Sequence, residues 1–345
     1  MNLGTAVSRS DQRLDSMSLK DSIFGPLFGC HSCDELKRTV SQLKKQLQDL
    51  SKENGTLKAQ FSALESASAQ PLVPVSAMSP ELGWAHLKAS VSGFKKPFLQ
   101  DAHQVLIAGE HAVLIVCDGA GSKKHSKAGA DFISGFLADK FRELVAGDAS
   151  ISAENWSALS RSIFSEAALA LKARAASENK LFDDFGCTCI VVYAGKDFVA
   201  CSHVGDGRAG YLAPSGHWKA LLTPYKGALA NATVFMTMLD SQNTDTLIAS
   251  HVVEGRTRAI VALSDGPEDV CWQVSAFDST GKKVVDPNQP SNEFLGKIAN
   301  QLVAATAQKA PQDSLDKLWA DFLTTGSPKL AAQVDDKTLL LALRG

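Results

Sequence analysis

The sequence has no long apolar run and no excess of charge of one sign. No stretch approaches the roughly 20 apolar residues that a helix needs to cross a bilayer. The first residues also lack the basic start and apolar core of a secretory signal. Lys and Arg number 35 and Asp and Glu number 37, so the formal net charge is only −2 and does not favour binding to nucleic acid or an anionic membrane. We therefore expect a cytoplasmic protein with neither nucleic acid nor a membrane as partner.

Two further features are missing. The phosphate-binding pattern G-x-x-x-x-G-K-[ST] does not occur, so the sequence gives no support for a P-loop nucleotide site. A framework of paired cysteines is also missing, because the chain has 7 cysteines, an odd number. Cys117, Cys187, Cys189 and Cys201 lie in apolar, strand-like stretches. We predict buried free thiols in a reducing compartment rather than disulfides.

Residues 1–30 are polar and show no sustained periodicity, so we expect them to be disordered. Cys30 and Cys33 have the spacing of half a zinc site, but no second pair of Cys or His follows at a suitable distance. Because a structural zinc site needs four ligands, we do not predict a metal there.

A heptad repeat runs through residues 31–66. Leucine recurs at every seventh position, and a second set of core positions lies between the leucines: Leu36, Val40, Leu43, Leu47, Leu50, Asn54, Leu57, Phe61 and Leu64. This spacing is typical of a coiled coil, and a single Asn in the core favours a parallel two-stranded register. We predict a parallel homodimer or a coiled coil with another protein; the alternative is an amphipathic helix that folds back on its own domain. Ala, Ser and Pro then mark residues 67–81 as a linker.

Residues 82–345 have the pattern of one mixed domain. Strand-like apolar runs cover 104–108, 112–117, 187–193, 198–204, 209–212, 217–221, 234–238, 246–253, 258–263 and 338–343. Helical patterns cover 126–145, 153–177, 292–308 and 314–325. Strands and helices occur in blocks rather than in strict alternation. This order favours an α+β fold of antiparallel sheets with helices layered outside.

Acidic residues stand at the ends of three of these strands. Two strands stop abruptly at Asp118-Gly119 and Asp265-Gly266, and Asp335-Asp336 leads into the last strand. Carboxylates at strand ends, far apart in sequence, can converge to hold hard divalent cations through oxygen. A single Asp-Gly pair is more simply explained as a hairpin turn. The recurrence of the pattern is what favours a metal site.

Several motifs together carry a family resemblance. QDAH at 100–103, DGAGS at 118–122, GCTCIVVYAGKDFVACSHVGDGRAGYL at 186–212, ALSDG at 262–266 and DDKTLLL at 335–341 occur in this order. With KGALANATVF at 226–235, they resemble the metal-dependent Ser/Thr protein phosphatases (PPM family, type 2C) in their divergent bacterial branch, over residues 84–345. The resemblance implies a four-layer αββα sandwich, in which helices flank two antiparallel sheets and metals lie at one end.

The resemblance also implies a set of metal ligands. Asp118 would bridge two metals, and the Gly119 carbonyl would bind one of them. Asp265 and Asp336 would ligate the other metal, although Asp335 is an adjacent competitor for the Asp336 position.

Four further positions receive roles from the same resemblance. Asp101 would orient a metal-bound water, and Lys96 stands where relatives often have an Arg that binds substrate phosphate. Asp206 and Asp269 match positions that hold a weaker third metal in some members. Asp206 is followed by Gly207 between two strands, so a simple hairpin turn is an equal alternative there.

The implied reaction is the hydrolysis of phosphoserine or phosphothreonine in proteins, a step of signal transduction, by a water that two Mg²⁺ or Mn²⁺ ions activate. Ala120 stands where many relatives have a His proposed as general acid, so the resemblance leaves the general acid open. Two alternatives remain: a non-catalytic phosphatase-like scaffold that binds phosphoproteins, and a hydrolase of a small phosphorylated metabolite.

Overall fold

The computed structural model describes residues 41, 42, 44–46, 48, 83–147, 151–225, 233–278 and 282–345. By its internal contacts the chain divides into two units, Met1–Pro71 and Leu72–Gly345. In the first unit the few described residues are helical and exposed. The predicted disorder over 1–30, the linker over 67–81 and most of the predicted coiled coil over 31–66 lie outside the described residues. The coiled coil therefore stays a prediction.

The first sheet joins segments from both ends of the domain. Its strands, all antiparallel to their neighbours, lie in the order β1 (Trp84–Val91), β14 (Lys337–Arg344), β9 (Ala259–Leu263), β6 (Arg208–Leu212) and β7 (Trp218–Ala220). Strand β1 pairs with β14 over its whole length, although the sequence patterns above assign no strand to residues 84–91.

The second sheet is a meander with one later addition. Its antiparallel strands lie in the order β2 (Ala102–Ala108), β3 (His111–Cys117), β4 (Cys189–Ala194), β5 (Phe198–Val204) and β8 (Ala249–Glu254). Strands β3, β4 and β5 are almost wholly buried, as expected for strands that lie between another sheet and a layer of helices.

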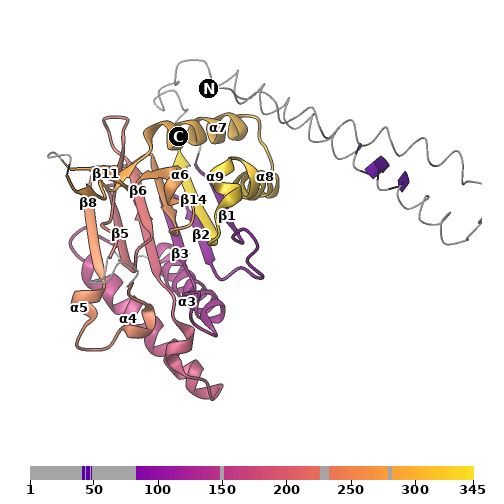
Figure 1. Cartoon of the computed structure of the whole chain (residues 1–345). Coiled ribbons are helices and arrows are strands. Elements are labelled where there is room, and N and C mark those ends of the chain that lie inside the picture. Colours follow the sequence, from indigo (N-terminus) through magenta and orange to yellow (C-terminus); the bar gives the residue numbers. More distant parts are fainter. Residues whose placement is uncertain are drawn as a thin grey trace, which may run out of the picture. The chain divides into compact units, whose positions relative to one another are not determined.

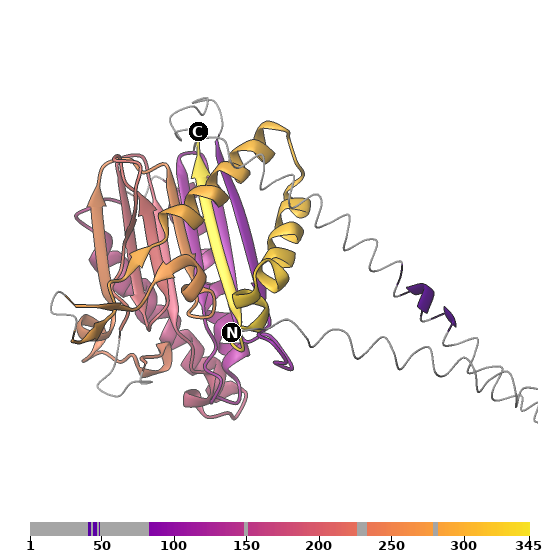
Figure 2. The ribbon, with the colours of Figure 1, turned by 45° about the horizontal axis from the view of Figure 1, so that its top comes forward.

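Helices cover the outer face of each sheet (Figures 1 and 2). Helices α3 (Ser126–Ala146) and α4 (Trp156–Ser177) pack on the second sheet, and α7 (Asn292–Ala307) and α8 (Gln312–Thr325) on the first. A third apolar cluster, which includes Leu114, Val192 and Ile260, lies between the two sheets. The four-layer αββα sandwich is confirmed.

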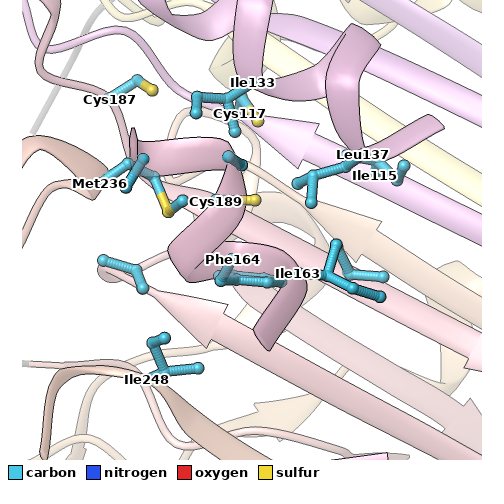
Figure 3. Close-up of a cluster of buried hydrophobic side chains, with 14 of the residues drawn as sticks. Ile115, Cys117, Ile133, Leu137, Ile163, Phe164, Cys187, Cys189, Met236 and Ile248 are labelled. Atoms are coloured by element: carbon cyan, nitrogen blue, oxygen red, sulfur yellow. The ribbon is translucent and has the colours of Figure 1, made fainter. Parts of the chain in front are cut away.

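The core between α3, α4 and the second sheet contains three of the four predicted buried thiols (Figure 3), and the fourth, Cys201, lies in the cluster between the sheets. The three are Cys117, Cys187 and Cys189, which lie with Ile133 and Phe164, and none of these side chains is more than 1% exposed. All cysteines of the described domain are free, so the prediction of buried, unpaired thiols is confirmed. Burial raises the pKa of each of these three thiols, which makes them poor nucleophiles.

Short elements connect the layers. They are η4 (Phe182–Phe185), η5 (Met236–Met238), α5 (Thr244–Leu247), α6 (Glu268–Cys271), α9 (Pro328–Ala332), and two small ribbons that pair β10 (Trp272–Gln273) with β13 (Gln289–Pro290) and β11 (Ala276–Phe277) with β12 (Val284–Val285). The predicted strand over 234–238 is wrong. Met236 is buried in the core and its N–H bonds to Cys187 O at 2.8 Å, and the segment then turns as a 3₁₀ helix.

Residues 205–210 read GDGRAG and so match the letters G-x-G-x-x-G. They join β5 of one sheet to β6 of the other, whereas a dinucleotide fingerprint opens a helix. The match therefore gives no nucleotide site. Of the helices in the described ranges, none combines the length and the apolarity of a membrane span.

Candidate metal and phosphate site

The acidic residues singled out above collect at one end of the sandwich because of how the strands alternate. Strand β3 ends where β2 begins, with Cys117 opposite Ala102. Strand β9 ends where β6 and β14 begin, with Leu263 opposite both Arg208 and Leu339. The residues just beyond these strand ends therefore share one edge: Asp101, Asp118, Asp206, Asp265, Asp335 and Asp336.

Asp101 lies at this edge, fully buried, and links the two sheets. Its Oδ2 accepts hydrogen bonds from Ser264 Oγ at 2.8 Å and Thr338 Oγ1 at 2.7 Å. Its Oδ1 is buried without a hydrogen-bond partner among the described residues. Burial raises the pKa of Asp101 to about 6, although the two hydroxyl donors act in the opposite direction. One oxygen is thus held in place and the other is left unsatisfied.

A chain of hydroxyl groups extends from Asp101 into the first sheet. Ser90 Oγ lies 2.6 Å from Thr338 Oγ1 and 2.7 Å from His103 Nδ1. Because Thr338 donates to Asp101, it must accept from Ser90, and Ser90 in turn accepts from His103 Nδ1–H. Burial lowers the pKa of His103 to about 4, so this histidine is neutral at pH 7. Ser90 and Thr338 could not be singled out from the sequence, since single hydroxyl residues in strands have no distinctive pattern.

Asp118 and Gly119 follow β3, where two contacts position the backbone. Thr188 Oγ1 lies 3.2 Å from Asp118 N, and Thr188 N donates to Asp118 O at 2.8 Å. A Cβ atom on Gly119 would lie 2.7 Å from Gln100 O, so only glycine allows this approach of the two segments. Burial, then the charges of Asp101 and Asp265, raise the pKa of Asp118 well above its ordinary value. The three carboxylates therefore repel one another.

Asp265 follows β9 on the other side of the cluster. Its Oδ1 is a second buried carboxylate oxygen without a hydrogen-bond partner in the described domain. Burial, then the charges of Asp335 and Asp206, raise the pKa of Asp265 to about 7. A Cβ on Gly266 would lie 2.0 Å from Asp336 O. Glycine is therefore required where this segment crosses the start of β14.

The two acids before β14 have different surroundings. Asp336 is 1% exposed, and its carboxylate accepts from Gly93 N at 3.1 Å and from Gln100 N at 2.6 Å. Asp335 is 47% exposed at its side chain, and its charge is among those that raise the pKa values of Asp118 and Asp265. The carboxylate of Asp336, the predicted ligand, is thus used to hold the backbone of a neighbouring loop. Asp335 Oδ1 accepts from Asp336 N at 2.8 Å, and the more exposed Asp335 carboxylate acts on the cluster through its charge. The sequence alone does not distinguish the roles of these two adjacent acids.

Lys96 bridges the same two acids. Its Nζ lies 2.8 Å from Asp335 Oδ1 and 3.0 Å from Asp336 Oδ2, with the lysine side chain 17% exposed. Burial alone would lower the pKa of Lys96, but the two carboxylates outweigh burial and raise it above the usual value. Lys96 is therefore protonated, and the two carboxylates hold its ammonium group beside the acidic cluster.

The two positions predicted for a weaker third metal differ in place. Asp206 lies in the turn between β5 and β6, and its charge acts on Asp265, so it belongs to the cluster electrostatically. Asp269 is exposed on α6. It lines a cavity of about 250 Å³ together with Gly266, Lys329 and Gln333.

The sequence patterns also missed a buried arginine that fixes this edge of the site. Arg208 is 1% exposed and contacts Glu268 Oε2 at 2.9 Å, Asp286 Oδ2 at 2.8 Å and Asn288 Oδ1 at 2.9 Å. Glu268 belongs to α6, three residues after Asp265. The guanidinium therefore ties α6 and the segment before β13 to the start of β6. An Arg next to Asp-Gly was the only signal in the sequence.

The donor chemistry of the cluster suits a hard divalent cation. Asp118, Asp265 and Asp335 act electrostatically on one another, and two buried carboxylate oxygens, on Asp101 and Asp265, lack hydrogen-bond partners among the described residues. Oxygen ligands of this kind are those that Mg²⁺ and Mn²⁺ take. As the side chains stand, no group of three His, Cys, Asp or Glu in the described residues could already hold an ion. The residues therefore fit a cation by type and charge, and ligation requires them to move closer together.

A family model matches most of the folded domain. The family model described as protein phosphatase 2C matches residues 95–316, which is more than half of the chain. The chain therefore belongs to the protein phosphatase 2C family. None of the curated proteins matches it.

Solved structures similar to the chain include two serine/threonine phosphatases. The serine/threonine phosphatase Stp1 from Staphylococcus aureus is 15% identical, with a TM-score of 0.47, and the match covers 78% of this chain and 97% of that one. The catalytic domain of the phosphatase PstP, in complex with two manganese ions, is 15% identical, with a TM-score of 0.48 and coverage of 76% and 98%. PppA from Pseudomonas aeruginosa is 16% identical, with a TM-score of 0.46 and coverage of 76% and 98%. The family assignment rests on the family model rather than on these structures.

Proposed function

We propose that the chain is a metal-dependent phosphatase that hydrolyses phosphoserine and phosphothreonine in proteins. The observation that carries the proposal is the gathering of Asp101, Asp118, Asp265 and Asp335 at one end of the sandwich, with two of their buried oxygens unsatisfied. Isolated, mutually repelling carboxylates are costly to bury unless a cation compensates them. Within this family, such a cluster supports a metal-dependent reaction.

The metal ligands that we propose are Asp118, the Gly119 carbonyl, Asp265 and Asp335, with Asp206 and Asp269 beside a weaker third ion. Asp335 takes the place that the sequence resemblance gave to Asp336, because both Asp336 oxygens have short contacts with donors at Gly93, Lys96 and Gln100. Bound Mg²⁺ or Mn²⁺ would supply a water that is acidic enough to ionise near neutral pH and would neutralise phosphate charge.

The protein's own groups would orient the reactants. Asp101, with Oδ2 fixed by Ser264 and Thr338, presents Oδ1 as a rigid acceptor for the attacking water. Lys96 is a protonated point charge beside Asp335 that would attract a phosphate oxygen, although without the two-pronged geometry of an Arg. His125 packs against Phe185, with ring centroids 5.3 Å apart, and we assign it no role as general acid.

The heptad pattern over residues 31–66 supports a dimer. We infer that a parallel two-stranded zipper, paired with itself or with another protein, carries the phosphatase domain on the linker that follows. A cytoplasmic location and a role in signal transduction stay predictions from the sequence.

The test is the release of phosphate from a phosphothreonine peptide by the full chain, with and without Mn²⁺. We expect turnover that requires Mn²⁺ or Mg²⁺ and stops with EDTA. Asp118→Asn should lower turnover by at least about 100-fold, since it removes one ligand charge from the cluster. Asp139→Asn is the matched control, because Asp139 lies on the surface of α3 in an ion pair with Arg142, and it should leave turnover unchanged.

The alternative, a phosphatase-like scaffold, predicts a different result in the same assay. Phosphopeptide binding that is equal in the unaltered chain and in Asp118→Asn, with no phosphate released under any metal condition, would favour the scaffold and contradict the phosphatase. Release of phosphate from small metabolites but from no peptide would instead show that the substrate is a small phosphorylated metabolite.

A further inference from the structure

Three large apolar side chains are exposed around the ion pair between Lys96 and Asp335. The exposed fractions are 52% for Phe94, 58% for Phe98 and 68% for Val334. Phe94 and Phe98 stand two residues before and two residues after Lys96, and Val334 directly precedes Asp335. We call these three side chains the apolar rim. It belongs to the same two segments that bring Lys96 and Asp335 to the candidate site.

The segments that carry the apolar rim are held firmly together. Phe94 N donates to Gln333 O at 2.6 Å, and Asp336 accepts from the backbone at both ends of the loop, Gly93 N and Gln100 N. A Cβ on Gly93 would lie 2.0 Å from Val334 O, so the two backbones are in contact. Since the backbone is fixed in this way, the exposure of the phenyl rings does not come from a loose loop.

One backbone conformation in the loop also points to a ligand-binding role. Lys95 has φ of 60°, the left-handed region that residues with a side chain rarely adopt. Such conformations cost about 1 kcal/mol or more and cluster at ligand clamps. Phe94 and Phe98 are both exposed on either side of Lys96, although burial of such rings would favour folding.

Two lysines beside the apolar rim could attract a phosphate ester. Lys95 Nζ lies 5.0 Å from the centroid of the Phe94 ring, and Lys96 Nζ lies between the two phenylalanines in sequence and beside the acidic cluster. Cations next to exposed apolar side chains suit a ligand that combines a dianion with apolar groups. In an extended peptide the neighbours of a phosphorylated residue lie about 3.3 Å further along per residue, which is within reach of rings that flank the phosphate-binding lysine.

We propose that the apolar rim binds apolar side chains that flank the phosphorylated serine or threonine of a protein substrate. The inference rests on the proposed function, because it takes Lys96 and the acids as the place where the phosphate binds. Apolar flanking side chains would cover Phe94 and Phe98 and remove them from water, which favours binding in proportion to the area covered. The phosphatase would therefore select substrates by the residues beside the phosphate.

The test uses peptides that cannot be hydrolysed, so that binding is measured whether or not the chain is active. Two fluorescent peptides carry the same phosphonate analogue of phosphothreonine, one flanked by Leu and Phe and the other by Ser and Gly. Fluorescence anisotropy with the full chain and Mn²⁺ should show about tenfold tighter binding of the apolar-flanked peptide. The ratio should fall to about 1 in the double variant Phe94→Ser/Phe98→Ser, with its folding checked by circular dichroism.

The matched control is Leu169→Ser, since Leu169 is 67% exposed on α4 and takes no part in the rim. It should keep the tenfold ratio. Equal binding of the two peptides by the unaltered chain, no binding of either, or a ratio that survives in the double variant would overturn the proposal. A membrane contact would also overturn the proposal. It would be indicated if the unaltered chain bound vesicles of phosphatidylcholine and phosphatidylserine, the double variant did not, and both proteins bound the two peptides equally. Hydrolysis of phosphothreonine peptides is measured separately. Its absence would refute the proposed function, whereas the binding ratio alone tests whether the apolar rim contacts the flanking side chains.

Discussion

Replacing each of the two acids before β14, Asp335 and Asp336, by Ala should affect different properties of the protein: stability in one variant, metal binding and activity in the other. Asp336→Ala removes the acceptor for two buried backbone donors, Gly93 N and Gln100 N. An unsatisfied buried donor costs about 1–3 kcal/mol, so the pair should cost about 3 kcal/mol of unfolding free energy. For a domain of this size that lowers Tm by about 10 °C. Asp335→Ala removes a half-exposed carboxylate that is paired with Lys96 and accepts from Asp336 N at 2.8 Å, and this loss should cost only about 1 kcal/mol.

Activity should show the opposite order. We expect Asp335→Ala to weaken Mn²⁺ binding and to lower turnover at saturating peptide by at least about 100-fold, with Tm in EDTA changed by no more than about 3 °C. Differential scanning fluorimetry in EDTA, titration calorimetry with Mn²⁺ and phosphate release separate the two effects. The reasoning is refuted if Asp335→Ala keeps full Mn²⁺ affinity, or if Asp336→Ala loses the metal while keeping its Tm.

Three further predictions concern the rest of the molecule. Burial raises the pKa of Asp265 in the folded protein to about 7, so ionisation of Asp265 costs nothing below about pH 4 and destabilises the metal-free fold increasingly between about pH 4 and 7, with the full cost above pH 7. In EDTA, Asp265→Asn should therefore have the Tm of the unaltered protein at pH 4 and a higher Tm at pH 8; an equal difference in Tm at the two pH values would contradict this. Gly266→Ala places a Cβ 2.0 Å from Asp336 O and should cost at least about 2 kcal/mol in urea unfolding, whereas Gly216→Ala, whose Cβ meets nothing within 4 Å, isolates the smaller cost of its positive φ. The full chain should sediment as a dimer and a chain starting at residue 82 as a monomer; the same number of chains per particle in both would refute the homodimer.

Local patterns were enough to predict the layers of the fold. Apolar runs that stop at Asp118 and Asp265 predicted the strands β3 and β9. Long helical patterns predicted α3 and α4 between these strands and α7 and α8 after β9. The missed strand β1 did carry a signal, because Ala85, Leu87 and Ala89 alternate with polar residues and face one apolar cluster. The strand wrongly predicted over 234–238 fails for a tertiary reason, since Met236 fills the core while its neighbours turn.

The site was less predictable than the fold. The sequence shows that acidic residues stand at the ends of strands, and the alternating direction of antiparallel strands brings these residues to one end of the sheet. It could not say which carboxylate, that of Asp335 or that of Asp336, accepts from the backbone donors of a loop some 240 residues away. Nor could it show that Arg208 is buried against Glu268, or that Phe94 and Phe98 stay in solvent. Each of these depends on contacts between distant segments.

The most direct test of the account is a crystal structure of the chain soaked in Mn²⁺, with anomalous diffraction used to locate the metal. We expect anomalous peaks at the end of the sandwich where β3 and β9 stop, in contact with the carboxylates of Asp118, Asp265 and Asp335. Peaks elsewhere on the protein only, or an acidic cluster that stays free of Mn²⁺ at millimolar concentration, would contradict it.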